Sequence, residues 1–334
     1  MTPTDLSEQG LELKVTSDLT GLTPAEVKAA QSVAEAPVAY DAEWVLGDPR
    51  DYDRQHVVDT RQLLAFLERT QPEVVTALNI GQPGSSRTKF LERVQSEVAK
   101  RGVVDVLRKG IRHGPESITL YFQTPTEGNQ TAIQRFRDNI FSVTRQLRYS
   151  LDETRRALDL VLFINGLPVA TLELKNQITN QNVTDAIDQY MKDRSPKEKL
   201  FQFGVCAVHF AVDDNEVWFT TRLNEKRTLF LPFNKGYNDG AGNPPNPFGI
   251  KTDYLWHDIL RRESLANLIE NFITRIEEKN EQGRKISKLI FPRYHQLDVV
   301  RRVLADARER GVGRKYLIQH SAGSGKSNSI SWLA

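Results

Sequence analysis

The sequence predicts a mixed α/β protein with a central sheet flanked by helices, followed by the beginning of a parallel-sheet lobe. Over the first 280 residues, amphipathic helical stretches alternate with short runs of β-branched and aromatic residues. Near the C-terminal end, an apolar run at residues 316–319 leads into a glycine-rich turn and then a helix. The length of 334 residues suits about two domains. We therefore expect one domain over residues 1–280 and the start of another over residues 281–334.

The individual elements follow from the spacing of apolar residues along the chain. Amphipathic periodicity predicts helices at residues 60–70, 91–109, 131–149, 183–192 and 260–278, and a helical pattern beginning within residues 291–300. Short β-rich runs predict strands at residues 118–122, 200–212 and 216–223, in addition to a hairpin within 158–176. Residues 236–249 are too rich in Gly, Pro and Asn for regular structure, and serve either as a plain surface loop or as a partner-contacting one. The charged stretch 279–288 is the expected linker.

Composition limits the classes of function. The chain is 39% hydrophobic and 26% charged, which is ordinary for a soluble globular protein. Its formal net charge is only +2, so any contact with nucleic acid must depend on local basic clusters such as residues 284–288 and 301–315. The single cysteine, Cys206, excludes an internal disulfide and a cysteine-based zinc site. With neither a signal-peptide core nor an apolar stretch of membrane-spanning length, we expect a cytoplasmic protein without a membrane partner.

The segment from Leu158 to Asn176, LDLVLFINGLPVATLELKN, has the pattern of a β-hairpin, because two apolar β-rich runs flank an Asn-Gly turn signal. Asp159 lies on the first run, and Glu173 and Lys175 on the second. A two-residue loop alone would pair Glu173 with Leu158 and turn it away from Asp159. An odd loop or a bulge reverses that parity. We therefore predict an odd loop or a bulge, which would place Asp159, Glu173 and Lys175 on one face.

Two carboxylates and a lysine on adjacent strands are typical of a site that cuts phosphodiesters. Mg²⁺ prefers oxygen ligands and keeps several waters, so Asp159 and Glu173 would suffice to hold it. Lys175 could orient the attacking water or neutralise charge that develops in the transition state. The alternative is that Asp159 is a polar residue at a strand end, with Glu173 and Lys175 part of an exposed cross-strand pattern.

The second motif, YLIQHSAGSGKSNSISWLA at residues 316–334, is typical of a phosphate-binding loop. Gly323 and Gly325 allow close approach of the backbone to phosphates, Lys326 would reach the terminal phosphates, and Ser327 would ligate Mg²⁺. His320 stands where the strict pattern has glycine. Upstream, the amide of Gln296 could recognise adenine and so select ATP; otherwise Gln296 is a solvated residue near a helix start. The acidic strand and second-lobe arginine of a nucleotide-driven motor would have to lie beyond residue 334.

Taken in order, these segments resemble the N-terminal part of the restriction (R, HsdR) subunit of type I restriction-modification enzymes. The matching pieces are FLERTQPEVV, RGVVDVLRKGI, LDLVLFINGLPVATLELKN, HFAVDDNEVWFTT, LPFNKG, GAGNPPNP, IFPRYHQLDVVRRV and YLIQHSAGSGKS. The resemblance implies a PD-(D/E)xK endonuclease domain joined to a RecA-like superfamily 2 motor lobe. It also implies ATP-driven translocation on double-stranded DNA, Mg²⁺-dependent cleavage away from the recognition site, and methyltransferase and specificity subunits as partners. The alternative is an ATP-driven DNA translocase in which the nuclease-like domain is only a DNA-binding or coupling module.

Carried over by position, the resemblance assigns Asp159, Glu173 and Lys175 to the nuclease signature, Gln296 to the adenine-reading glutamine, and Gly325, Lys326 and Ser327 to motif I of the motor. Two positions depart from the related pattern. Related nucleases often carry Gln-x-x-x-Tyr on the helix after the second carboxylate, whereas here Gln189 and Tyr190 are adjacent. Several also use an acidic residue on the first helix, for which Glu92 is the candidate, although a solvent-facing glutamate is the alternative.

Overall fold

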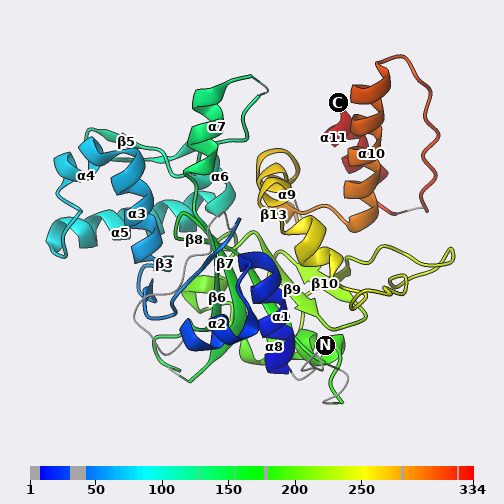
Figure 1. The fold of residues 1–334 in the computed structure, drawn as a ribbon, viewed down its shortest axis with the longest axis horizontal. Helices are drawn as coiled ribbons and strands as arrows, with labels where there is room; N and C mark the ends of the chain where they lie inside the picture. Colours follow the sequence, from blue (N-terminus) through cyan, green and yellow to red (C-terminus); the bar gives the residue numbers. More distant parts are fainter. Residues whose placement is uncertain are drawn as a thin grey trace.

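The computed structural model describes residues 8–30, 43–126, 128–153, 155–176, 180–279, 282–321 and 323–334. A seven-stranded mixed sheet forms its centre, in the order β1-β6-β7-β8-β9-β10-β11 (Figure 1). The strands are β1 (Val45–Leu46), β6 (Phe141–Arg148), β7 (Ala157–Ile164), β8 (Leu167–Leu174), β9 (Val208–Val212), β10 (Val217–Thr220) and β11 (Leu231–Pro232). The predicted mixed α/β architecture with helices around a central sheet is confirmed.

The middle of the sheet is built from an antiparallel meander followed by a parallel crossover. β6, β7 and β8 pair antiparallel, and β9 then pairs parallel to β8. A parallel neighbour requires a long connection, which here carries α8 (Val183–Asp193). All eight residues of β8 are buried, as expected for a central strand covered on both faces.

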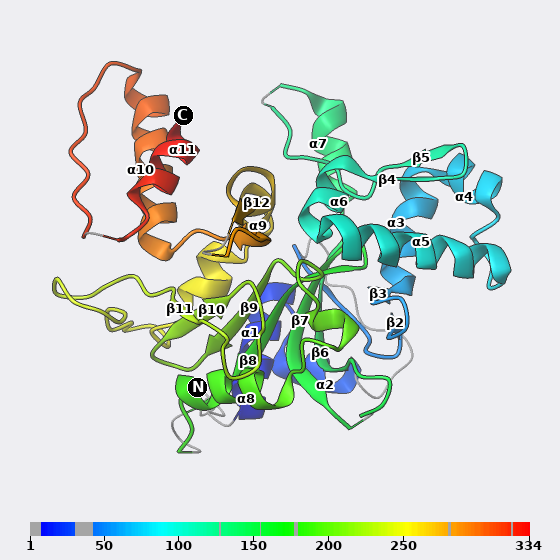
Figure 2. The ribbon, with the colours of Figure 1, turned by 180° about the vertical axis from the view of Figure 1, so that it is seen from behind.

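Helices cover the sheet and extend one end of it. Helix α1 (Glu8–Thr20) packs against β6 and β8; it lies in front of the sheet in Figure 1 and behind the strands in Figure 2. Several short elements form a group at the upper left of Figure 1, and they extend the same hydrophobic core. These and the small strands near them are β2 (Tyr52–Asp53), β3 (Val58–Asp59), α3 (Thr60–Thr70), α4 (Pro72–Leu78), α5 (Ser85–Arg101), α6 (Val103–Lys109), β4 (Ile111–His113), β5 (Glu116–Ile118) and α7 (Gln130–Arg137). Helix α2 (Pro24–Ala30) instead packs against α1, and its buried residues belong to a separate small hydrophobic cluster.

The C-terminal part begins with short helical segments and a hairpin. They are η3 (Leu255–Ile259), α9 (Arg262–Asn267), η4 (Leu268–Phe272), β12 (Thr274–Lys279) and β13 (Lys285–Ile290), and the helices α10 (Tyr294–Arg310) and α11 (Lys326–Leu333) follow. The short helical segment η2 (Lys199–Phe201) lies earlier in the chain, between α8 and β9. Helices α10 and α11 pack together and stand away from the sheet in both views, at the upper right of Figure 1 and the upper left of Figure 2.

The predicted helix at residues 131–149 is wrong in its second half. Helix α7 ends at Arg137, and β6 begins at Phe141. The sequence FSVTRQLR is rich in β-branched and aromatic residues, and its pairing with β7 on one side and β1 on the other overrides the helical spacing. The predicted helix 91–109 is divided between α5 and α6 at Gly102, where φ is +88°. The expected strand 118–122 is only the short β5, which ends at Ile118.

Three further predictions near the C-terminal end are wrong. The predicted helix 260–278 ends at Phe272 and gives way to β12, because its polar sequence TRIEEK pairs with β13 instead. Residues 285–288 of the expected linker therefore belong to a strand, and the expected boundary at 280 and 281 falls outside the described residues. The predicted strand 316–319 is irregular, since no described strand pairs with it.

The remaining predictions are confirmed in type. Helices α3 and α8 match residues 60–70 and 183–192 within one residue, and a helix begins at Lys326. The strands at 200–212 and 216–223 are present but shorter, as β9 and β10. Residues 236–249 contain no helix or strand beyond a single bridge between Tyr237 and Gly240.

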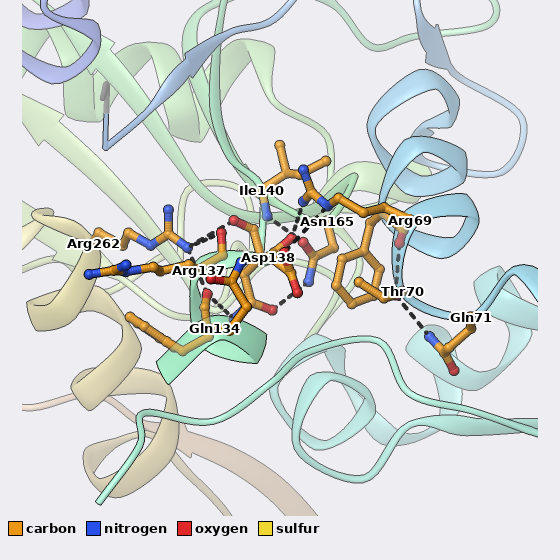
Figure 3. A network of polar contacts seen from close by, with 12 residues as sticks. Arg69, Thr70, Gln71, Gln134, Arg137, Asp138, Ile140, Asn165 and Arg262 are labelled. Carbon is orange, nitrogen blue, oxygen red and sulfur yellow. Dashed lines mark hydrogen bonds and ion pairs between the residues drawn. The ribbon is translucent and has the colours of Figure 1, made fainter. Parts of the chain in front are cut away.

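The turn between β7 and β8 is buried and held by neighbouring segments (Figure 3). Asn165 Oδ1 accepts a hydrogen bond from Ile140 N–H at 2.6 Å, and Asn165 Nδ2 donates to Leu120 O at 2.8 Å. Asn165 and Gly166 both have positive φ, at 49° and 79°, as a type I′ hairpin turn requires. A Cβ at Gly166 would lie 2.4 Å from Asp59 O, so only glycine fits there.

Candidate functional site

The β7–β8 hairpin combines a two-residue turn with a bulge. Ile164 pairs with Leu167 around the turn, but the register shifts at Leu162, which pairs with Ala170, so that Val169 is the extra residue. Beyond the bulge Leu160 pairs with Leu172, and the same register places Asp159 opposite Glu173. Of the predicted odd loop or bulge, the bulge is confirmed, and the two carboxylates share one face.

Asp159 is held at the edge of this pair. Its Oδ2 accepts a hydrogen bond from the backbone N–H of Leu174 at 2.7 Å, and its Oδ1 accepts one from Gln146 Nε2 at 3.4 Å. Gln146 belongs to β6 but has a left-handed φ of 50°. The neighbouring strands β6 and β8 therefore both fix the orientation of the Asp159 carboxylate.

Glu173 is fully buried, and one of its two oxygens is bonded to protein. Arg194 Nε donates to Oε1 at 2.6 Å, whereas Oε2 has no hydrogen-bond partner among the described residues. Burial, reinforced by the charge of Asp159, raises the pKa of Glu173 to about 8, although Arg194 and Lys175 act in the opposite direction. A buried carboxylate oxygen without a partner is costly and is suited to receive a cation.

Lys175 follows Glu173 by two residues, just after β8 ends, and its side chain is only 8% exposed. Its backbone N–H donates to Val212 O at 2.8 Å, which continues the pairing with β9. Its positive charge is one of those that lower the pKa of Glu173, so the ammonium lies near that carboxylate. Asp159, Glu173 and Lys175 are therefore gathered at the same place on the sheet.

A third carboxylate, Glu12 of α1, approaches Asp159 from the helix that covers the sheet. It is 2% exposed, and it accepts hydrogen bonds from Gln146 Nε2 at 2.6 Å and from Arg145 Nη2 at 3.2 Å. Burial and then the charge of Asp159 raise the pKa of Glu12 to about 7. Consecutive residues on a regular strand point to opposite faces, yet both Arg145 and Gln146 reach Glu12. The left-handed backbone at Gln146 explains how its side chain can turn to the same face.

The glycine-rich loop lies at the start of α11, some distance along the chain from these carboxylates. Gly323 and Gly325 have φ values of 73° and 79°, and Lys326 is the first helical residue, with Ser327 next to it. Lys326 Nζ donates to the carbonyls of His320 at 3.0 Å and Ser321 at 2.9 Å, so the side chain folds back over the loop. The predicted glycine-rich turn and helix are therefore present, but the predicted strand before them is not.

Gln296 joins α10 to that loop. It is buried, its Nε2 donates to Ser324 O at 3.1 Å and Gly325 O at 2.9 Å, and its Oε1 accepts from Arg293 N–H at 2.8 Å. Both ends of the amide are engaged by protein. The loop and Gln296 line a cavity of about 450 Å³, which is also bounded by the basic side chains of Arg222, Arg227, Lys288 and Arg293. Its basic lining suits a phosphate-bearing ligand.

Comparison with known proteins decides the family. The family described as type I restriction enzyme R protein N terminus matches residues 43–228, more than half of the chain. The chain belongs to this R protein family. A Methanocaldococcus jannaschii protein, provisionally named type I restriction enzyme MjaVIIIP endonuclease subunit, is 29% identical over 204 residues. The type I restriction enzyme HindI endonuclease subunit of Haemophilus influenzae is 25% identical over 202 residues. Each alignment covers 59% of this chain and 18% of the relative, so the chain spans less than a fifth of their length.

The two accessory residues proposed on α8 take different positions. Tyr190 is fully buried, and its hydroxyl lies 2.7 Å from Thr171 Oγ1, which in turn lies 2.8 Å from His209 Nδ1. Burial lowers the pKa of His209 to about 3, so the histidine is neutral at ordinary pH. Tyr190 therefore belongs to the core beneath β8, whereas Gln189 beside it is half-buried.

Glu92, the candidate acidic residue, has the exposure expected of the solvent-facing alternative. Glu92 is exposed on α5, whereas Glu12 of α1 lies beside Asp159. Glu12 could have been identified from its position between apolar residues in EQGLELKV. A lone glutamate on a buried helix face needs a partner. Arg194 was also missed, because a charged residue just after a helix resembles an ordinary solvated helix end.

In the described part of the chain, no group of three or more His, Cys, Asp or Glu side chains is arranged as a metal site. Mg²⁺ is often bound through one or two carboxylates and several waters, so Asp159 and Glu173 fit that ion by their chemistry. The partnerless Oε2 of Glu173 supplies the oxygen that such an ion would take. Among the described residues, no helix is long and apolar enough to cross a membrane.

Proposed function

We propose that this segment carries the Mg²⁺-dependent DNA endonuclease centre of a type I restriction enzyme, built on a PD-(D/E)xK fold. The observation that carries the proposal is the bulged hairpin, which places Asp159 opposite Glu173 with Lys175 beside them. Without the bulge at Val169 the two carboxylates would point to opposite faces. The names of the relatives, which are endonuclease subunits, support the same activity.

In this proposal each residue has a separate role. Asp159 and Oε2 of Glu173 would hold the cation, which when bound supplies polarisation of a phosphoryl oxygen and acidification of a water. Lys175 would orient the attacking water or neutralise the charge that grows on the phosphate. Because Lys175 is nearly buried, its positive charge acts more strongly on the phosphate than an exposed charge would.

We further propose that residues 281–334 begin a RecA-like, superfamily 2 motor lobe that binds ATP and drives translocation along double-stranded DNA. Lys326 and Ser327 open a helix behind a glycine-rich turn. The turn residues Gly323, Ser324 and Gly325 line the basic cavity, whose charge is suited to nucleotide phosphates. ATP hydrolysis would need further motifs of the complete subunit. The methyltransferase and specificity subunits would supply site recognition, and cleavage would occur away from the recognised sequence.

The test is Lys175→Ala in the complete subunit, assembled with its partner subunits. We expect cleavage of double-stranded DNA to be lost while ATP hydrolysis and translocation continue, since Lys175 lies far from the nucleotide loop along the chain. Lys192→Ala is the matched control, because Lys192 is an exposed lysine of α8 that pairs with Asp188. Undiminished cleavage by the Lys175→Ala enzyme would contradict the assigned role.

The alternative is that the protein acts as a translocase. Its nuclease-like domain would then only bind DNA or couple other parts of the enzyme. Asp159→Asn and Glu173→Gln separate the two, because a binding or coupling module needs no divalent cation at these carboxylates. Retention of cleavage by both variants would favour the alternative, and loss of cleavage in both with translocation preserved would favour the endonuclease.

A further inference from the structure

Arg194, the residue that follows α8, is tied to β7, to β8 and to the residue just after β6. Its Nε donates to Glu173 Oε1 at 2.6 Å, its Nη2 to Ala157 O at 2.7 Å, and its Nη1 to the Tyr149 hydroxyl at 3.2 Å. Its guanidinium also lies 5.4 Å from the centre of the Tyr149 ring. Only 4% of Arg194 is exposed, so these bonds hold a buried guanidinium.

This arrangement leaves Glu173 with one oxygen occupied and one oxygen open. Oε1 faces Arg194, and the fully buried Oε2 has no hydrogen-bond partner among the described residues. A guanidinium is planar and rigid, so its bond to Oε1 restricts the rotation of the carboxylate and fixes the direction of Oε2. Asp159 occupies the facing position on β7, so a cation held by Asp159 would meet Glu173 through Oε2.

We propose that Arg194 is a positioning residue of the endonuclease centre, which holds the Glu173 carboxylate so that Oε2 is presented to the divalent cation. The inference rests on the proposed function. Ligating carboxylates are commonly hydrogen-bonded by a second group, and loss of that group typically lowers metal affinity or activity by about 10- to 100-fold. Arg194 makes no contact with the cation itself in this scheme.

The sign of the effect distinguishes positioning from obstruction. A positive guanidinium near a cation site repels the cation, so an arginine that merely competes for Glu173 would weaken metal binding, and its removal would tighten it. An arginine that orients Glu173 and compensates its buried charge has the opposite effect, because its removal leaves a buried carboxylate without a partner and free to rotate.

The experiment measures Mn²⁺ binding to the complete subunit by electron paramagnetic resonance, without nucleotide so that the phosphate loop adds no cation. We expect Arg194→Gln to bind Mn²⁺ about 10- to 100-fold more weakly than the wild type, and Arg194→Lys to fall between them. In the assembled enzyme, kcat for DNA cleavage should fall at fixed Mn²⁺ while KM for DNA stays constant, and added Mn²⁺ should restore part of the rate. Unchanged or tighter Mn²⁺ binding would overturn the inference.

Two further variants keep the test decisive. Arg156→Gln is the matched control, because Arg156 donates to Asp193 O at 2.8 Å in the same region, has no bond to Glu173, and should leave Mn²⁺ affinity unchanged. Tyr149→Phe removes one anchor of Arg194 but keeps its ion pair, and should weaken Mn²⁺ binding in the same direction by less. If Arg194→Gln does not fold, as judged by near-UV circular dichroism, Tyr149→Phe and Arg194→Lys decide the question.

The failure of the inference can be told from the failure of the proposed function. Wild-type Mn²⁺ binding that is lost in Asp159→Asn but kept at full strength in all Arg194 and Tyr149 variants would overturn only the positioning role. A wild-type subunit whose Mn²⁺ binding does not depend on Asp159 would overturn the proposed centre, and the positioning role with it.

Discussion

The side chain of Asn165 accepts a 2.6 Å hydrogen bond from the backbone N–H of Ile140, and thereby fastens the turn of the β7–β8 hairpin to the start of β6. The same side chain donates to Leu120 O at 2.8 Å and Asn139 Oδ1 at 3.0 Å. The hairpin that carries both carboxylates is thus fixed at its closed end by bonds to two distant segments. Its open end carries Asp159 and Glu173.

Asn165→Ala should lower the free energy of unfolding by about 3 kcal/mol or more, because it leaves buried backbone groups of Ile140 and Leu120 without partners. Urea unfolding of the chain followed by circular dichroism measures the change. Asn238→Ala is the matched control: Asn238 has the same φ of 49° as Asn165 but is exposed in the 236–249 loop, so it reports only the cost of alanine in a left-handed conformation. Equal losses in the two variants would contradict the buried-bond explanation.

The bulge in this hairpin could be predicted from the sequence, because only the parity of the side chains was needed. Asp159 and Glu173 share a face only if one residue is added between them, whatever the rest of the chain does. By contrast, residues 141–148 were predicted as helix, because their apolar spacing fits both periods and the deciding contacts are made with β1 and β7. Local patterns identified the two strands that carry Asp159 and Glu173, but they did not identify β6, which lies beside β7 in the sheet.

The residues that complete the site could not be predicted, because they approach from far along the chain. Glu12 bonds to Gln146, 134 residues away, and Arg194 bonds to Tyr149, 45 residues away. Each contact depends on how α1 and α8 pack on the sheet, which no local periodicity specifies.

Glu12→Gln should lower the affinity of the complete subunit for Mn²⁺ by about tenfold or more, since it removes a negative charge beside Asp159 while keeping an oxygen for Gln146. Isothermal titration calorimetry measures the affinity. Glu92→Gln makes the same chemical change on the exposed face of α5 and should have no effect. An equal loss in both variants, or a loss in Glu92→Gln alone, would reinstate Glu92 as the accessory carboxylate.

Asp59 should make stability depend on pH. It begins α3, where its Oδ1 accepts from Gln62 N–H at 3.0 Å and its Oδ2 is buried without a partner, and burial raises its pKa from 3.8 to about 7. Between these values the folded state binds more protons than the unfolded state, so the free energy of unfolding falls as pH rises from about 4 to about 7. Above pH 7 this contribution is constant.

Asp59→Asn keeps the capping oxygen and removes the titration. Relative to the wild type, this variant should therefore gain stability steadily as pH rises from about 4 to about 7, and then hold that gain. Thermal unfolding at a series of pH values measures the difference. A wild-type stability that rises relative to Asp59→Asn over this range would reverse the assigned sign.

Gly325→Ala should abolish tight nucleotide binding by disturbing Gln296 rather than by touching the nucleotide. Its Cβ would lie 2.4 Å from Gln296 Nε2, and φ at this residue is +79°, so either the loop or the buried amide must move. We expect at least about a tenfold loss of affinity for a fluorescent ATP analogue, equivalent to about 1.4 kcal/mol of binding free energy. Gly313→Ala is the matched control, since Gly313 also has positive φ, at 97°, but its Cβ would meet open space. If both variants lost affinity equally, backbone strain alone would explain the effect, and the contact between Gln296 and the loop would have no role in holding the nucleotide site.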